Sequence, residues 1–294
     1  MKRRIYTLDV FTTRPYAGNP LAVVTDGDGL SHERMQAIAR EMNLSETVFV
    51  QKPTNDKALA RLRIFTTTQE LPLAGHPVIG TWFLLAELGV VPASEGVVHV
   101  TQQLEAGLLP VEIVFEEGRP SRVTMTQTPA RFFPCKVSKP KLMQSLGLKA
   151  SDLHRKLPLE YVSTGIFNLM VPLRAASVLK KIKIDIHALA NLMADRGVMA
   201  YCFAPDGKGK ARARGMLPWE LNEDPATGSA CGSMAAYLVH HGTHKAGEKL
   251  SVLQGVEMGR ESHIEVNVMR QSDGKLVPYV SGSAVRIMEG HIEA

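Results

Sequence analysis

The sequence carries one pattern twice, and this repeat is the strongest indication of the fold. Residues 72–89 read PLAGHPVIGTWFLLAELG, and residues 225–242 read PATGSACGSMAAYLVHHG. The two stretches align without gaps at an offset of 153 residues, with proline first, glycine fourth and glycine last in both. Each predicts a tight glycine turn, then an apolar helix that ends at glycine. Because both helices are apolar nearly all round, we expect them to be buried on every side.

A second pair of helices precedes the first pair. Residues 30–44 read LSHERMQAIAREMNL and predict an amphipathic helix with Ser31 as its N-cap. Residues 183–197 read KIDIHALANLMADRG and place apolar side chains at the same spacing, offset by 151 residues. Short alternating or β-branched runs around these helices predict strands of a mainly antiparallel sheet. The repeat therefore predicts an α+β protein of two similar halves, with a boundary between Glu117 and Pro134.

Composition narrows the class of protein. A chain of 294 residues with 45% hydrophobic and 21% charged residues is typical of a soluble globular protein. The net charge is +5, and we interpret the basic residues as spread along the chain, with a mild attraction for anionic small molecules. Aromatic residues make up only 6%, so stacking platforms for single-stranded nucleic acid are not expected. The composition predicts no nucleic-acid partner.

Location follows from the N-terminus and the cysteines. Asp9 and several threonines interrupt any apolar region after the basic start, so a secretory signal is not expected, and no run of residues is long enough for a membrane span. The three cysteines, Cys135, Cys202 and Cys231, show no CxxC spacing. This pattern predicts a cytoplasmic protein without a disulfide framework, a zinc cluster or a membrane partner.

Both central helices are expected to begin at a glycine turn, where free N–H groups favour an anion. If the halves face each other about a pseudo-two-fold axis, the two N-termini converge on a cleft that suits a small carboxylate. The alternative is that both are simply capped core helices.

Differences between the halves point to chemistry. After the turn glycine, one half has His76 and the other Ser229, and Asp224 aligns with Leu71. Glu46, in the stretch NLSETVFV, stands before a strand-like run, where a carboxylate is rarely buried unpaired. Burial would raise the pKa of Glu46 towards neutrality, as a general base requires. Alternatively, Glu46 ends a helix or pairs with Arg40 on the surface.

Four motifs in this order resemble the PhzF-like family of phenazine-biosynthesis isomerases: FTTRPYAGNPLAVV (11–24), NLSETVFV (43–50), LPLAGHPVIGT (71–81) and NEDPATGSACGSMAAYL (222–238). The resemblance implies the diaminopimelate epimerase fold, with two pseudo-repeated lobes, each a curved, mainly antiparallel β-barrel around a central apolar helix. We expect an N-terminal lobe at 1–122, a C-terminal lobe at 123–280, and a final strand at about 281–294 that returns to the first lobe.

The resemblance also implies roles for individual residues. Glu46 matches the catalytic glutamate of the family, and His76 and Asp224 match its supporting polar residues. Positions around the substrate carboxylate are matched by Asn19, Ser45, Gly75, Gly228 and Ser229. The family implies a homodimer, and no metal or other cofactor is expected.

The leading functional hypothesis is a cofactor-independent isomerase that shifts a proton within a small carboxylate such as a dihydro-hydroxyanthranilate, with one glutamate as acid and base. An amino-acid epimerase or racemase of the same fold is an alternative, but those enzymes use a cysteine at each helix N-terminus. Here these positions are His76 and Ser229, and Cys231 is expected in the core. A non-catalytic protein that binds a small ligand is a third hypothesis. The histidines at 240, 241 and 244 could suggest a metal, but histidines at a helix end more often complement the helix dipole.

Overall fold

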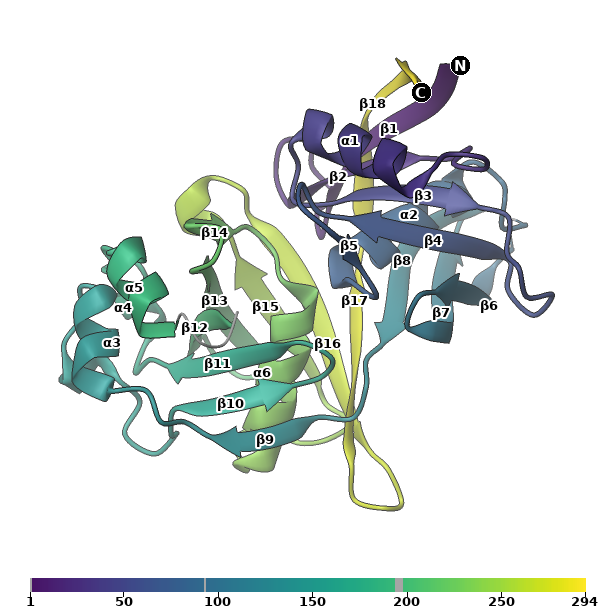
Figure 1. Ribbon diagram of the computed structural model, residues 1–294. Helices are drawn as coiled ribbons and strands as arrows, with labels where there is room; N and C mark the ends of the chain where they lie inside the picture. Colours follow the sequence, from purple (N-terminus) through teal and green to yellow (C-terminus); the bar gives the residue numbers. More distant parts are fainter. Residues whose placement is uncertain (1, 93, 194–197) are drawn as a thin grey trace. The chain divides into compact units, whose positions relative to one another are not determined.

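The computed structural model describes residues 2–92, 94–193 and 198–294 (Figure 1). The chain divides into two compact units. Unit 1 holds residues 1–126 and 281–294, and unit 2 holds residues 127–280. The sequence predicted an N-terminal lobe at 1–122 and a C-terminal lobe at 123–280. That these are two independent domains stays a prediction. Within the described parts of the chain, no helix is both long and apolar enough to cross a bilayer.

Unit 1 is a mixed sheet that wraps a central helix. Neighbouring strands pair in the order β18, β1, β2, β3, β4, β6, β7, β8, and only β2·β3 and β4·β6 are parallel. The C-terminal strand β18 lies antiparallel to β1, so the two ends of the chain lie side by side (Figure 1). The strands are β1 (Lys2–Val10), β2 (Asn19–Val24), β3 (Thr47–Gln51), β4 (Ala60–Phe65), β5 (Glu70–Leu71), β6 (Gly96–Leu104), β7 (Gly107–Glu116), β8 (Arg119–Thr126) and β18 (Ala284–Glu293).

The central helix of unit 1 is α2 (Gly75–Glu87), which packs on β1, β2, β7, β8 and β18. Its residues from His76 to Ala86 are buried except Phe83, which confirms the expectation from its apolar sequence. Glycine at position 80 allows this close packing, because a Cβ there would lie 2.5 Å from a methyl group of Val10. The indole of Trp82 donates to the Gln102 side chain at 2.8 Å, so its one polar atom is satisfied inside the core.

The amphipathic helix α1 (His32–Met42) covers the other face of this sheet. Ser31 caps it as predicted, with its hydroxyl accepting from the Arg34 N–H at 3.2 Å. Met35, Ile38 and Ala39 pack against apolar side chains of β1 to β4, including Phe49. The helix ends at Asn43, whose left-handed φ of 51° turns the chain towards β3.

Unit 2 repeats the plan of unit 1. Its strands pair in the order β9, β10, β11, β12, β13, β15, β16, with β11·β12 and β13·β15 parallel and the others antiparallel. The strands are β9 (Arg131–Pro134), β10 (Glu160–Ser163), β11 (Phe167–Pro172), β12 (Met199–Pro205), β13 (Lys210–Leu217), β14 (Asn222–Asp224), β15 (Lys249–Gln254), β16 (Ser262–Arg270) and β17 (Leu276–Gly282). The same alternation of pairings in both units confirms the repeat. Closure of either sheet into a barrel stays a prediction.

The central helix of unit 2 is α6 (Gly228–His240), which packs on β10, β11 and β16. It begins 153 residues after the start of α2, as the aligned glycines predicted. Between Ala230 and Val239 every residue is buried.

An outer layer covers the sheet of unit 2. It consists of α3 (Lys139–Ser145), the short 3₁₀ helix η1 (Ala150–Asp152), α4 (Ala176–Leu179) and α5 (Ile186–Met193), while a second 3₁₀ helix, η2 (Val256–Met258), follows β15. Leucine, valine and isoleucine side chains of this layer pack against β10 to β13 in one apolar cluster. Helix α5 corresponds to the second predicted amphipathic helix, and the last four residues of that predicted motif, 194–197, lie outside the described residues.

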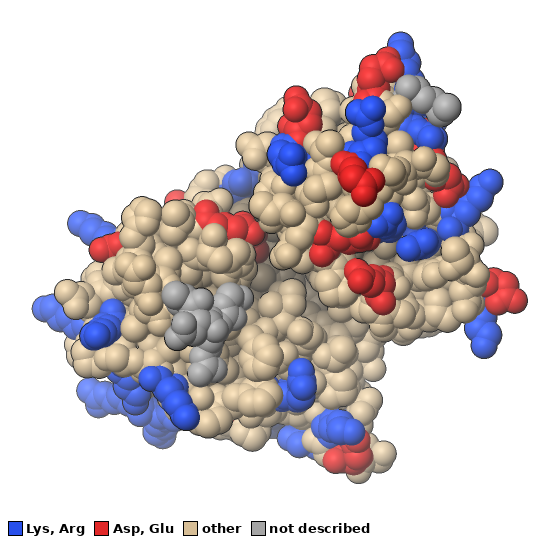
Figure 2. Space-filling model, in the orientation of Figure 1, with Lys and Arg blue, Asp and Glu red and all other residues tan. Residues whose placement is uncertain are grey.

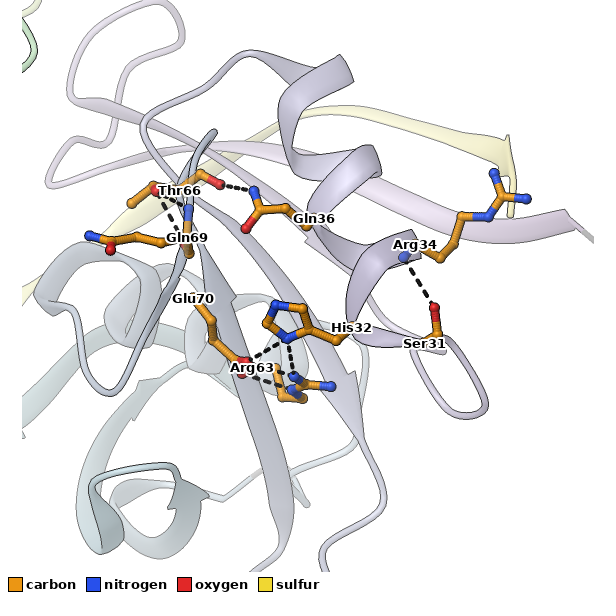
Figure 3. A network of polar contacts seen from close by, with 8 residues as sticks. All are labelled: Ser31, His32, Arg34, Gln36, Arg63, Thr66, Gln69 and Glu70. Carbon is orange, nitrogen blue, oxygen red and sulfur yellow. Dashed lines mark hydrogen bonds and ion pairs between the residues drawn. The ribbon is translucent and has the colours of Figure 1, made fainter.

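An ion pair recurs at equivalent places in the two units. In unit 1, Arg63 of β4 donates through two nitrogens to Glu70 of β5, at 2.7 and 2.6 Å, and His32 lies beside them (Figure 3). In unit 2, Arg214 of β13 holds Glu223 of β14 in the same way, at 2.8 and 2.7 Å. We call these pairs the Arg–Glu clamps. Each clamp fixes the short strand that leads into a central helix, so it sets where that helix begins.

Candidate active site

Glu46 lies directly before β3, at the point where the buried part of this strand begins. Thr47, the next residue, is fully buried, whereas the Glu46 side chain is 16% exposed. The left-handed turn at Asn43 and the short segment after it bring Glu46 to this edge of the sheet. Ser45 is exposed beside it. The carboxylate is therefore largely withdrawn from water but remains accessible from one side.

His76 faces this carboxylate from the second position of α2. Its Nε2 atom lies 3.2 Å from Oε2 of Glu46, although the alignment falls short of a formed hydrogen bond. Burial lowers the pKa of His76 from 6.5 to about 3, so the imidazole is neutral near pH 7. A loosely aligned contact of this kind is common at catalytic groups before substrate binds.

Asn19, the first residue of β2, holds the other side of the imidazole. Its Nδ2 atom lies 3.3 Å from His76 Nδ1, and its side chain is fully buried. With the amide in this orientation, Nδ1 accepts a hydrogen bond and the ring proton lies on Nε2, towards Glu46. Gly18 makes the approach possible, because its φ is 68° and a Cβ there would lie 2.2 Å from the Val10 carbonyl oxygen.

Asp224 occupies the last position of β14 in unit 2 and is 9% exposed. One carboxylate oxygen accepts a 2.5 Å hydrogen bond from the Thr227 hydroxyl. The Glu223 side chain, which alternates to the other face of the strand, belongs to the Arg–Glu clamp of this unit. The clamp and the Thr227 hydroxyl together fix the carboxylate of Asp224 close to the start of α6.

The N-terminus of α6 is open to an acceptor. The first helical hydrogen bond runs from Cys231 N–H to Thr227 O, so the N–H groups of Gly228, Ser229 and Ala230 are not used within the helix. Thr227 gives α6 no side-chain cap, since its hydroxyl is directed to Asp224. Three adjacent N–H groups at the positive end of a buried helix can bind a carboxylate.

A buried polar network, not expected from the sequence, sets this end of α6. Gln254 of β15 donates to the Asp224 carbonyl oxygen at 2.8 Å and to the Thr227 hydroxyl at 3.0 Å. Its own oxygen accepts from the Thr227 N–H and from the Tyr201 hydroxyl. Gln127 and Thr164 donate to the carbonyl oxygens of the first two helical residues. A glutamine within a strand-like run was the one sign of this network in the sequence. Its partners could not be predicted, because they lie 27 to 53 residues away along the chain.

The predicted site residues thus form two groups, each within one unit. In unit 1 the structure brings together Glu46, His76 and Asn19 at the start of α2, where Gly75 is the first helical residue and Ser45 is a near neighbour in sequence. In unit 2 it brings together Asp224, Gly228 and Ser229 at the start of α6. The catalytic and binding roles of all eight stay predictions.

One group of possible metal ligands occurs among the described residues, at the far end of α6. Glu160, His240 and His241 place their ligand atoms within 4.8 Å of one another. His241 Nε2 lies 2.9 Å from Glu160, and the His240 ring stacks on Phe132. Both histidines therefore have a structural role, because His240 connects the end of α6 to β9 and His241 connects it to β10. His244 contacts the Glu248 carbonyl oxygen instead.

Two repeated units, each with polar groups at the start of a buried central helix, define a class of α+β proteins with a duplicated fold. Residues 8–290 match the model of the PhzC-PhzF family, described as phenazine biosynthesis-like protein. The chain belongs to this family.

Relatives and solved structures agree with this assignment. Trans-2,3-dihydro-3-hydroxyanthranilate isomerase of Pseudomonas aeruginosa is 34% identical over 288 residues, which cover 98% of each chain. The crystal structure of a PhzF-family phenazine biosynthesis protein of Bacillus anthracis superposes with a TM-score of 0.89 at 30% identity, over all of both chains. A probable proline racemase of Agrobacterium radiobacter shares the fold at 16% identity, with a TM-score of 0.72 over 99% of this chain and 93% of that one. The predicted family, fold class and enzyme class, a PhzF-like isomerase, are confirmed.

Proposed function

We propose that this protein is an isomerase that moves a proton within a small carboxylate-bearing molecule, with Glu46 as the single acid and base. The Glu46 carboxylate removes a proton from one carbon, the neighbouring π electrons shift, and the resulting carboxylic acid returns the proton to another carbon. Such a step is balanced without an oxidant or a second substrate. It therefore needs no cofactor.

The observation that carries this proposal is the 3.2 Å separation of His76 Nε2 and Glu46 Oε2 in a buried setting. A carboxylate that is partly withdrawn from water is a stronger base towards a carbon acid than an exposed one. The neutral imidazole can donate a hydrogen bond to the Glu46 carboxylate. A protonated imidazole would instead form an ion pair with it and weaken it as a base. Asn19 keeps this donor in place by occupying Nδ1.

The residues of unit 2 fit the recognition of the carboxylate of the substrate. Its negative charge would be stabilised by the N–H groups of Gly228 and Ser229 at the start of α6. Asp224, held by Thr227, would accept a hydrogen bond from a hydroxyl or amino group of the substrate. An amino-hydroxy carboxylate offers both kinds of group, as the substrate named for the Pseudomonas relatives does.

The test uses trans-2,3-dihydro-3-hydroxyanthranilate in heavy water, followed by proton NMR. We expect conversion with deuterium at the receiving carbon, and a loss of about 10²- to 10⁴-fold in Glu46→Gln, the range that general acid–base groups contribute. Glu41→Gln removes an exposed carboxylate of α1 and serves as the matched control. A loss below tenfold in Glu46→Gln would assign the base to another group.

If this substrate is not converted, a set of small carboxylic acids is screened for deuterium exchange that depends on Glu46. Exchange with one of them would retain the reaction and change the substrate. If none exchanges although several bind, the protein is a non-catalytic binder of small carboxylates.

An amino-acid epimerase of the same fold is the second candidate, and Cys231 argues against it. That reaction needs a second acid or base on the opposite face of the substrate. The Cys231 side chain is fully buried, contacts the Tyr201 hydroxyl at 2.8 Å, and has its pKa raised to about 12 by burial. It cannot supply a thiolate near pH 7. We also carry forward two predictions: a homodimer, which the family resemblance implies, and a cytoplasmic location, which the cysteine pattern and the N-terminal sequence predict.

A further inference from the structure

The positive charge of this protein is concentrated in the outer layer of unit 2. Residues 136–185 contain ten lysines and arginines but only three acidic residues, so this segment carries more positive charge than the whole chain, whose net charge is +5. All ten basic side chains are exposed. Figure 2 shows Lys and Arg gathered at the lower left, where Figure 1 places α3. The even spread expected from the sequence is therefore wrong for this segment.

A groove lies within this basic layer. One pocket of about 620 Å³ is lined by Ser151, Leu153, His154, Arg155, Lys156 and Arg174. A second pocket of about 240 Å³ shares residues 153–156 and continues to Lys139 and to residues 157–159. The two pockets together form what we call the basic groove. Its volume is in the range that accommodates a small-molecule ligand.

Two acidic residues adjoin the groove in sequence, Asp152 and Glu160, and both are already engaged. Glu160 lies 2.9 Å from Nε2 of His241. Asp152 has two partners. It accepts from the Lys149 backbone N–H at 3.1 Å and pairs with Arg174 at 3.1 Å. The bonds from the Lys149 N–H and Arg174 lower the pKa of Asp152, so it stays ionised and keeps Arg174 oriented. Arg155 and Lys156 form no ion pair with the described residues. The groove therefore presents uncompensated positive charge beside a fixed guanidinium.

We propose that the basic groove binds an oligophosphate group, either as a free small molecule or as part of a nucleotide. One arginine guanidinium can donate two parallel hydrogen bonds to a phosphate group, and a lysine ammonium adds a flexible point charge. Two arginines and two lysines along one groove match the several charges of adjacent phosphates better than a single carboxylate. The lining residues of the groove include no Phe, Tyr or Trp. Its one imidazole, His154, accepts through Nδ1 from the backbone N–H groups of Lys156 and Leu157. We therefore expect recognition to use the phosphates and not a stacked base.

Isothermal titration calorimetry with pyrophosphate and with ATP tests this inference on the full chain. We expect one site per chain for both ligands at physiological salt, and affinity at least about tenfold weaker in the double variant Arg155→Gln/Lys156→Gln. The matched control, Lys52→Gln/Lys57→Gln, removes the same charge from exposed positions of unit 1 and is expected to retain the affinity.

Several results would overturn the inference. These are no binding of either ligand, equal weakening in both double variants, or tighter binding of a single-stranded RNA than of either phosphate ligand. The first would leave the groove without a ligand, the second would reduce the effect to overall charge, and the third would assign the surface to nucleic acid. Arg155 and Lys156 lie outside the proposed acid–base groups, so isomerase turnover is expected to be unchanged in the variant. A failure here is thus separate from a failure of the proposed function.

Discussion

Glu46 and His76 meet through Oε2 and Nε2 at 3.2 Å, one from the start of a strand and the other from the start of the central helix of the same unit. Their contact joins an acid that is partly exposed to an imidazole that is buried and neutral. The pair therefore places a neutral ring N–H beside a largely buried carboxyl group. We expect the loss of stability at acidic pH to depend on His76, and the rate of turnover to depend on Glu46.

The stability of the fold is expected to depend on His76 at acidic pH. Burial lowers the folded-state pKa from 6.5 to about 3, so between these values the unfolded chain binds a proton that the folded chain does not. Stability is therefore complete above pH 6.5 and falls as the pH decreases towards 3. From pH 7 to pH 4 the loss should be at most about 3 kcal/mol for this group.

Urea unfolding of the native protein and of His76→Gln at pH 7 and pH 4 measures this contribution. The variant should lose less stability on acidification than the native protein does. His99→Gln, at an exposed position of β6, should behave as the native protein. Identical acid sensitivity in the native protein and in His76→Gln would contradict the assignment of the buried neutral imidazole.

Asp224 and Thr227 should separate catalysis from stability. Asp224→Asn retains an oxygen that can accept from the Thr227 hydroxyl, so we expect impaired turnover with a normal melting temperature. Thr227→Val removes that hydroxyl and leaves the Asp224 and Gln254 groups without it, which should cost about 1–3 kcal/mol. Thermal unfolding and the deuterium assay are compared for both. A large loss of stability in Asp224→Asn would mark the aspartate as structural.

The two Arg–Glu clamps should differ in strength because their surroundings differ. Arg214 is 9% exposed and also donates to the carbonyl oxygens of Leu179 and Ile182, so Arg214→Met should cost about 3–5 kcal/mol. Arg63 is 17% exposed, and Glu70 retains a contact with His32, so Arg63→Met should cost less, about 1–3 kcal/mol. Urea unfolding measures both. The double variant Arg214→Met/Glu223→Met should recover part of the loss, and equal costs for the two single variants would refute this ranking.

Gly255 should be needed for the turn that supports the start of α6. Its φ is 76°, and a Cβ there would lie 2.4 Å from the Arg260 carbonyl oxygen and 2.6 Å from that of Pro225. Gly255→Ala should therefore cost more than about 2 kcal/mol and reduce turnover by displacing the residues next to Asp224. Gly259→Ala is the matched control, since Gly259 has a φ of 71° with no atom near its Cβ position. Its cost should be about 1 kcal/mol, and similar effects of the two would rule out a steric role.

Much of the fold could be predicted because its signals are local or repeat at a fixed offset. The aligned glycines located both central helices, and the spacing of Met35, Ile38 and Ala39 located α1. The outer helices α3 and α4 were not predicted, since they have only seven and four residues and are held by packing against β10 to β13. Short helices of this kind derive little stability from their own sequence.

The candidate site could be predicted as residue types but not as contacts. His76, Glu46 and Asp224 differ from their counterparts in the repeat, and that asymmetry is visible in the sequence. The Asn19 contact with His76 spans 57 residues, and the Gln254 network spans up to 53. No local periodicity encodes which distant amide faces which ring, because that depends on how the strands pair.

After an internal duplication, the two copies of a fold can change independently without loss of stability only at positions whose side chains are not needed to hold the fold together. In each unit the Arg–Glu clamp holds the short strand through the glutamate, so the residue that follows, Leu71 in one copy and Asp224 in the other, is not needed to hold it. Mutation can exchange an apolar side chain for an acid there while both copies still fold. A symmetric ancestor can thus acquire an asymmetric site by point mutation, while the Arg–Glu clamp is present in both copies.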